Sequence, residues 1–249
     1  FRSLKMYRID SPLTLSDVMP HLTAMGVKVI DEVPAKFELR GVDAYLYDFG
    51  LELPAGCEFW SERNADLFTD AVVASYQRRI EADQLNQLVT EAGLSWRQTG
   101  LLRALSRYLQ QVGIAYSQSY ISQSILRNQG LAVDLLTLFK LKFDPELVLD
   151  ESAITRLQES IETKLEAVPS LDDDRILRLI YQVVQALVRT NFYTSQHQNG
   201  AEALALKLLP KRLAMLPEPR PEYEIFVYSP RVEGVHLRFG KVARGGLRW

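Results

Sequence analysis

The chain has 249 residues, of which 47% are hydrophobic and 24% charged, as is ordinary for soluble globular proteins. Its 29 Lys and Arg residues and 31 Asp and Glu residues give a formal charge of −2. This balance argues against nucleic acid as a partner, because that binding usually needs a basic excess. No apolar run is long enough to cross a bilayer, and a single cysteine, Cys57, excludes an internal disulfide. We therefore expect a cytoplasmic protein without a membrane segment.

The first 80 residues are predicted to form an incomplete ferredoxin-like unit. The predicted elements are strands at residues 4–9, 27–33 and 43–53 and helices at residues 14–26 and 58–77. Thr14 offers an N-cap to the first helix, Gly26 closes it, and Pro20 should bend or shorten it. The fourth strand of a complete βαββαβ unit is missing, because the pattern stays helical from Arg78 onward.

Residues 81–216 have an almost continuous helical pattern. The expected helical segments are residues 95–112, 130–143, 154–165 and 170–188. Ser170 is the expected N-cap of the last segment, with Asp173 three residues later. No repeat of fixed period is present, which argues against a solenoid. We therefore predict a helical domain over this range.

Residues 217–249 begin a new unit. Pro217, Pro219 and Pro221 suggest a stiff linker, and two strands are predicted after it, at residues 223–228 and 235–238. The fold class expected for the whole chain is therefore α+β, with an incomplete sandwich, a helical region and a short β segment. Neither end carries the features of a natural terminus, so we expect an internal piece of a longer polypeptide.

The last twelve residues contain the strongest candidate site. They place Arg244 and Arg248 on either side of the pair Gly245-Gly246, with two more cations before them. Paired glycines allow a ligand to approach backbone N–H groups closely, and flanking cations favour an anion such as a carboxylate or phosphate. A turn with solvated charges remains the simpler alternative for this spacing.

Other polar groups favour structural roles. The acids at 172–174 suggest a metal site, but their place at a helix start favours capping instead. His21, His197 and His236 are far apart and have no companion ligand at metal-binding spacing. The sequence also lacks GxGxxG, GxxxxGK[ST], HExxH and GxSxG patterns. We therefore predict no catalytic, metal-binding or cofactor-binding residues in this chain.

Several long runs resemble the large, multidomain NAD-specific glutamate dehydrogenases. They are residues 224–238, 241–249, 93–97, 170–178 and 187–191. The resemblance implies that residues 1–80 are the last ACT-like domain, that 81–216 are helical, and that 217–249 begin the catalytic domain. ACT-like folds often bind amino acids or mediate oligomer contacts. Other domains, sister subunits and an amino-acid effector are therefore the implied partners.

In this family the element Gly-Gly-aliphatic-Arg borders the glutamate site. The resemblance therefore implies that Arg244, Gly245, Gly246 and Arg248 bind substrate, with Arg244 standing where smaller relatives have a lysine. It also implies that the full-length enzyme uses NAD to convert L-glutamate to 2-oxoglutarate and ammonia. The catalytic lysine, its acidic partner and the nucleotide-binding fold follow Trp249 in the family pattern. We expect this chain alone to bind no NAD and to be inactive.

Two alternatives remain open. The chain could be a free-standing amino-acid-sensing module, with its ligand near residues 10–17. It could also be a helical oligomerisation module that buries its apolar stripes against sister subunits.

Overall fold

The computed structural model describes residues 2–57, 60–194 and 203–240, together with the backbone of 246–248. The chain divides into two compact units, Phe1–Thr99 and Gly100–Trp249, and each unit has its own sheet. The boundaries predicted after residues 80 and 216 differ from this division. Within the described residues, no helix combines the length and apolar character needed to cross a membrane.

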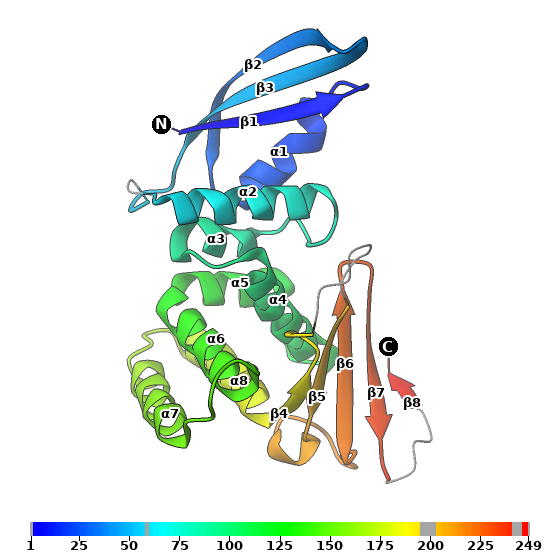
Figure 1. Cartoon of the computed structure of the whole chain (residues 1–249). Coiled ribbons are helices and arrows are strands. Elements are labelled where there is room, and N and C mark those ends of the chain that lie inside the picture. The colour runs from blue at the N-terminus through cyan, green and yellow to red at the C-terminus, as the bar shows by residue number, and fades with distance from the viewer. Residues whose placement is uncertain (1, 58–59, 195–202, 241–245, 249) are drawn as a thin grey trace. The chain divides into compact units, whose positions relative to one another are not determined.

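The first unit contains the predicted order of strand, helix, strand, strand and helix (Figure 1). Its elements are β1 (Arg2–Ile9), α1 (Leu15–Ala24), β2 (Lys28–Leu39), β3 (Val42–Glu52), α2 (Glu62–Tyr76), η1 (Gln84–Asn86) and α3 (Gln87–Ala92). Thr14 caps α1 as predicted, because its side chain accepts a hydrogen bond from the backbone N–H of Asp17. The helix continues through Pro20 to Ala24.

The three strands form an antiparallel sheet in the order β1-β3-β2. This is the order of a ferredoxin-like unit without its fourth strand, which would lie on the outer edge of β1. One face of the sheet is packed by α1 and α2, and Leu22, Phe49 and Phe68 are buried between these elements. The predicted incomplete unit is therefore confirmed.

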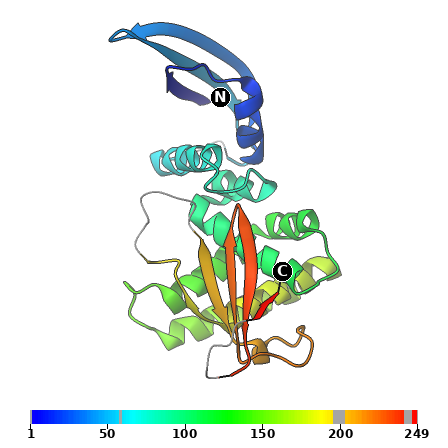
Figure 2. The ribbon, with the colours of Figure 1, turned by 90° about the vertical axis from the view of Figure 1, so that its right-hand side faces the viewer.

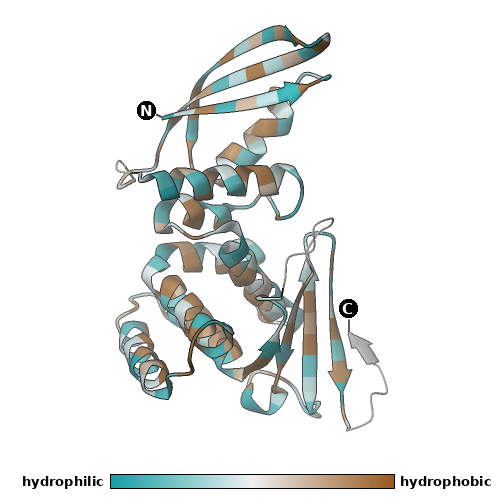
Figure 3. Ribbon diagram, viewed as in Figure 1, coloured by the Kyte–Doolittle hydropathy of each residue, from teal (hydrophilic) through white to brown (hydrophobic). Residues whose placement is uncertain are grey.

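The other face of this sheet is rich in exposed apolar side chains. Directly paired residues of neighbouring strands share a face. The pairing of Tyr7 with Leu46 and of Phe37 with Ala44 puts these residues on the face opposite the helices. Tyr7 is 65% exposed and Val33 62% exposed. Hydrophobic segments alternate with hydrophilic ones along all three strands (Figure 3). We call this surface the open sheet face.

The hairpin between β2 and β3 is longer than predicted. The prediction ended the second strand at residue 33, but β2 continues to Leu39, which pairs with Val42. Arg40 and Gly41 form the two-residue turn with φ angles of 52° and 81°. Positive φ at both positions is typical of the type I′ turn, whose twist matches that of the flanking strands.

The described residues of the second unit contain a five-stranded sheet, four complete helices and most of α4, which begins at Trp96 in the first unit. The helices are α4 (Trp96–Gln111), α5 (Gln118–Arg127), α6 (Gln129–Phe143), α7 (Glu151–Glu166) and α8 (Leu171–Ala186). The remaining elements are β4 (Leu187–Thr190), β5 (Leu204–Leu208), η2 (Pro210–Arg212), β6 (Tyr223–Ser229), β7 (Val232–Arg238) and β8 (Gly246–Arg248). The strands are all antiparallel, in the order β4-β5-β6-β7-β8. Helices lie against one side of this sheet (Figures 1 and 2).

The helical prediction is wrong for two segments between residues 187 and 208. Strand β4 follows α8 directly, and β5 lies between β4 and β6. In β5, Leu206 and Leu208 are buried, with Lys207 between them less so. This period of two is a strand signal that the surrounding helical pattern concealed. The proline-containing stretch 217–221 therefore connects two neighbouring strands of one sheet, β5 and β6.

Candidate functional site

The candidate substrate-binding segment ends at the outer strand of the five-stranded sheet. Arg244 and Gly245 lie outside the described residues, whereas Gly246 and Arg248 belong to β8. The register of β8 on β7 places Gly246 opposite Leu237 and Arg248 opposite Val235. The backbone of Gly246–Arg248 is therefore held by an antiparallel ladder.

The sheet beside this segment is tied to α4 by a buried polar contact. The hydroxyl of Tyr108 donates a hydrogen bond to Glu224 Oε2 at 2.6 Å, and both residues are at most 1% exposed. The Tyr108 ring also packs on Phe226, with ring centroids 5.5 Å apart. A buried carboxylate is costly unless it accepts hydrogen bonds. This contact therefore fixes β6, and through its pairing β7, against the helices.

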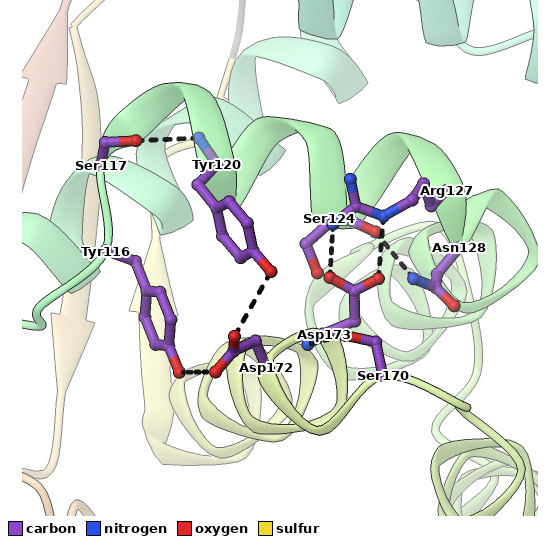
Figure 4. A network of polar contacts seen from close by, with 9 residues as sticks. All are labelled: Tyr116, Ser117, Tyr120, Ser124, Arg127, Asn128, Ser170, Asp172 and Asp173. Carbon is purple, nitrogen blue, oxygen red and sulfur yellow. Dashed lines mark hydrogen bonds and ion pairs between the residues drawn. The ribbon is translucent and has the colours of Figure 1, made fainter.

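The first turn of α8 is held by an ion pair to α5 (Figure 4). Arg127 donates two hydrogen bonds to Asp173, from Nε at 2.9 Å and from Nη2 at 2.5 Å. The Arg127 guanidinium holds the pKa of Asp173 below its ordinary value. The Ser170 side chain caps the helix by accepting from the Asp173 backbone N–H. The predicted cap at Ser170 is thus confirmed.

The neighbouring acid, Asp172, also contacts α5 and the residues before it. It accepts hydrogen bonds from the hydroxyls of Tyr116, at 2.7 Å, and of Tyr120, at 3.5 Å (Figure 4). The two tyrosine rings stack with centroids 5.6 Å apart. The predicted position of these acids at a helix start is confirmed, since all three lie in the first turn of α8. Among the described residues, no group of His, Cys, Asp or Glu side chains has the arrangement of a metal site.

The last turn of α8 is held by a lysine from α6. Lys142 Nζ donates to the carbonyl oxygens of Val184, Gln185 and Leu187 at 2.7, 3.1 and 3.3 Å. The last carbonyls of a helix have no partner within the helix, and a cation also complements the helix dipole there. Burial first, and then the charge of Arg212, lower the pKa of Lys142 to about 8. Lys142 therefore satisfies carbonyl groups at the junction where α8 ends and β4 begins.

The histidines do not come together. His21 Nδ1 lies 2.7 Å from Ser75 Oγ, and burial first and Arg78 second lower the pKa of His21, which favours a neutral structural role. His197 lies outside the described residues. His236 is on β7, opposite Leu247, and its Nε2 is buried without a hydrogen bond to any described residue.

A cavity lies beside α1, and Ser16 is the part of the suggested amino-acid segment 10–17 that lines it. It has a volume of about 610 Å³, and its wall includes Ser16, Met19 and Thr23 of α1 together with Asp83 and Gln87. The preceding loop is closed onto the sheet, since the Leu13 backbone N–H donates to the Tyr47 hydroxyl at 2.7 Å. A ligand there stays a prediction.

Sequence reasoning did not single out Arg127 or Lys142. Arg127 is 46 positions from its partner Asp173, and Lys142 is 42 or more positions from its carbonyl partners. Pairs so distant in sequence have no local periodicity to reveal them. The sequence shows basic residues near the end of α6, but it does not show which carbonyl oxygens they contact.

The fold and this terminal segment define an α+β protein that begins with a unit of the ACT type. Three family models match in chain order: the glutamate dehydrogenase ACT3 domain over residues 1–65, glutamate dehydrogenase helical motif 3 over 80–145, and the bacterial NAD-glutamate dehydrogenase catalytic domain over 160–249. The last match contains α8, all five strands and the candidate segment.

Individual relatives are similar along nearly the whole chain. NAD-specific glutamate dehydrogenases from Halomonas elongata and Pseudomonas aeruginosa are each 39% identical, over 99% and 98% of this chain. The protein of the same name from Mycobacterium tuberculosis is 43% identical over 95% of it. The chain therefore belongs to the NAD-specific glutamate dehydrogenase family. It spans 15%, 16% and 15% of the length of these three relatives, respectively.

Proposed function

We propose that this chain supplies one side of the glutamate pocket in an NAD-dependent glutamate dehydrogenase, with Arg244, Gly245, Gly246 and Arg248 as the substrate-binding residues. In the full-length enzyme, L-glutamate, NAD and water would give 2-oxoglutarate, ammonia and NADH. The observation that carries the proposal is the docking of Gly246–Arg248 as an edge strand within the region that matches the catalytic domain.

This arrangement suits a dicarboxylate for two physical reasons. Glycine has no Cβ, so a carboxylate can approach the backbone N–H groups of the pair closely. Arginine can hold a carboxylate by two parallel hydrogen bonds, which fixes its orientation as well as its position. Because a β-ladder holds the backbone of Gly246–Arg248 before substrate arrives, little ordering is required on binding.

The remaining chemistry is assigned to other domains of the enzyme. Hydride transfer to NAD requires a dinucleotide site and proton-transferring groups, and no GxGxxG pattern occurs in these 249 residues. We propose that residues 1–80 and the helical region regulate and scaffold the enzyme, and that the 249-residue chain alone neither binds NAD nor turns over. A cytoplasmic setting would suit a metabolic enzyme of this kind.

The test of the pocket uses the full-length enzyme. Arg244→Met and Arg248→Met should each raise the KM for glutamate at least about tenfold, because each loses a charge-assisted contact, while the KM for NAD stays close to wild type. Arg231→Met is the matched control, since Arg231 is an exposed arginine in the turn between β6 and β7. An unchanged KM for glutamate in both variants would refute the assignment. The 249-residue chain, incubated with glutamate and NAD, should form no NADH.

The scaffolding role is supported by the open sheet face. Exposed apolar residues in such number usually mark a contact surface, and the relatives continue far beyond the matched region. Replacing Tyr7 and Val33 together by Asp should weaken assembly of the full-length enzyme, measured by sedimentation velocity. An unchanged sedimentation coefficient would count against a role for this face.

The main alternative is an amino-acid-sensing module, which the cavity beside α1 favours. In that case, blocking the cavity by Thr23→Trp should abolish any amino-acid binding that calorimetry detects. Binding that persists in this variant would exclude the cavity as the sensor.

A further inference from the structure

The buried side chain of Tyr108 contacts β6 at two positions. Its hydroxyl donates a hydrogen bond to Glu224 Oε2 at 2.6 Å, and its ring packs on Phe226 with centroids 5.5 Å apart. Glu224 and Phe226 are two residues apart in one strand, so their side chains point to the same face of the sheet. A single residue of α4 therefore holds two successive positions of that face.

Each of these positions begins a row of directly paired residues that crosses the sheet to β8. The members of the two rows come from β6, β7 and β8, and they are Glu224, Leu237 and Gly246 in one row and Phe226, Val235 and Arg248 in the other. Neighbouring strands are about 4.8 Å apart, so each row spans roughly 10 Å. The rows that Tyr108 holds at β6 thus end at two of the proposed substrate-binding residues.

The helix that carries Tyr108 provides a fixed support. In α4, residues 101–106, Tyr108 and Leu109 are each at most 1% exposed, so this part of the helix is buried on nearly every side. Side chains in such close-packed surroundings cannot move without displacing their neighbours. The Tyr108 hydroxyl therefore sets the position of β6 rather than following it.

The hydrogen bond also joins two regions that match different family models. Tyr108 lies in the match to helical motif 3, and Glu224 lies in the match to the catalytic domain, 116 positions later. One side of the proposed pocket is thus supported by a residue that precedes the catalytic-domain match.

We infer that Tyr108 is a positioning residue for the pocket that binds the dicarboxylate substrate, an inference that rests on the proposed function of the terminal segment. Tyr108 acts through the ladder, because its contacts with β6 fix where β7 and β8 lie. Without its hydroxyl, the Glu224 carboxylate loses a charge-assisted hydrogen bond and the two rows shift together. A displacement of about 1 Å at a binding site can weaken activity as much as 10²-fold, so the pocket should respond to a small shift.

The test compares Michaelis constants of the full-length enzyme. Tyr108→Phe should raise the KM for glutamate, and in the reverse direction the KM for 2-oxoglutarate, at least about threefold, because both dicarboxylates use the same pocket. The KM for NAD should stay close to wild type. A purely structural role would only reduce the amount of active enzyme, which lowers the apparent kcat and leaves every KM unchanged. That second pattern would overturn the inference.

Tyr181 offers a matched control. Its hydroxyl donates to Glu162 Oε1 at 3.3 Å, and the residue is 6% exposed, but this hydrogen bond joins α8 to α7 and does not involve the sheet. Tyr181→Phe therefore removes the same kind of contact and should leave the KM for glutamate unchanged. An equal rise in both tyrosine variants would show a general loosening of the unit and would also overturn the inference. Thermal melts establish that each variant is folded.

A milder change at the same contact covers the case in which Tyr108→Phe does not fold. Glu224→Gln keeps an oxygen that can accept from Tyr108, but the bond loses its charge assistance, so the KM for both dicarboxylates should rise at least about twofold. Unchanged values would then refute the role of Tyr108.

The positioning role and the pocket assignment fail in different ways. If Arg248→Met raises the KM for glutamate while Tyr108→Phe behaves like Tyr181→Phe, only the role of Tyr108 is refuted. If Arg244→Met, Arg248→Met and Tyr108→Phe all leave this KM unchanged, the pocket lies elsewhere and both proposals are refuted.

Discussion

The ion pair between Arg127 and Asp173 should be one of the strongest single contacts in the second unit. Asp173 is 4% exposed and accepts two hydrogen bonds from one guanidinium. Asp173→Asn removes the charge and keeps at most one of those hydrogen bonds. Charge-assisted hydrogen bonds contribute about 1.5–3 kcal/mol each, and the Arg127 side chain is 48% exposed, which screens part of that value. We expect the free energy of unfolding to fall by about 2 kcal/mol.

The adjacent acid provides a matched control. Asp174→Asn removes the same charge from the same helical turn, so its effect on the helix dipole is similar. Asp174 pairs with Arg178 one turn later at 2.7 Å, and exposed pairs of this kind contribute only about 0.5 kcal/mol. Urea denaturation at pH 7 measures both variants. If Asp174→Asn costs as much as Asp173→Asn, the reasoning about the buried pair is refuted.

The effect of Asp173 should also depend on pH with a definite sign. Its folded-state pKa is lowered below the ordinary 3.8, so the folded state favours the ionised form. The stabilisation is therefore present above about pH 4 and is lost as the pH falls through the folded-state value. The difference between wild type and Asp173→Asn should shrink in that acidic range. A difference that stays constant down to pH 2 would show that the charge is not its source.

Two further substitutions test other parts of the fold. Tyr108→Phe removes the 2.6 Å hydrogen bond that the buried Glu224 carboxylate accepts, so we expect the free energy of unfolding in urea to fall by about 1–3 kcal/mol. A fall of less than about 0.5 kcal/mol, the range of an ordinary surface substitution, would contradict this. Arg40→Asn places a residue that tolerates positive φ at the first turn position, and we expect a gain of about 0.5–1 kcal/mol in the same assay. Gly41→Ala should lose stability there, and a stabilised Gly41→Ala would contradict the turn type.

The first unit could be predicted well from the sequence because its signals are local. The cap at Thr14, the alternation in the first strand and the turn at Gly41 each involve neighbouring residues. Strands β4 (LVRT) and β5 (LALKL) were missed because they are short and their sequences continue the composition of the preceding helices. β5 pairs with β6, which begins fifteen residues after the end of β5, and β4 pairs in turn with β5. The contacts that hold α8 join residues more than 40 positions apart, which periodicity does not reveal.

The candidate segment at residues 244–248 was predicted from its residue types rather than from periodicity. Paired glycines between arginines indicate an anion site from composition alone, but that pattern does not distinguish a pocket from an exposed turn. The structure adds the register of Gly246 and Arg248 on β7. The pairing of Gly246 opposite Leu237 could not be read from the sequence, because the chain between the two strands has no repeating pattern.

The direct passage from α8 into β4 has a mechanical consequence. No loop separates Ala186 from Leu187, and Lys142 ties the carbonyls on both sides of that junction to α6. A helix of this length is about 24 Å long, so a small tilt at Asp173 becomes a larger displacement at its far end. A movement of α5 that preserves the ion pair between Arg127 and Asp173 must therefore also move α8 and the strand β4 that follows it. The ion pair at the start of α8 and the sheet that contains Gly246 are then mechanically coupled through this helix.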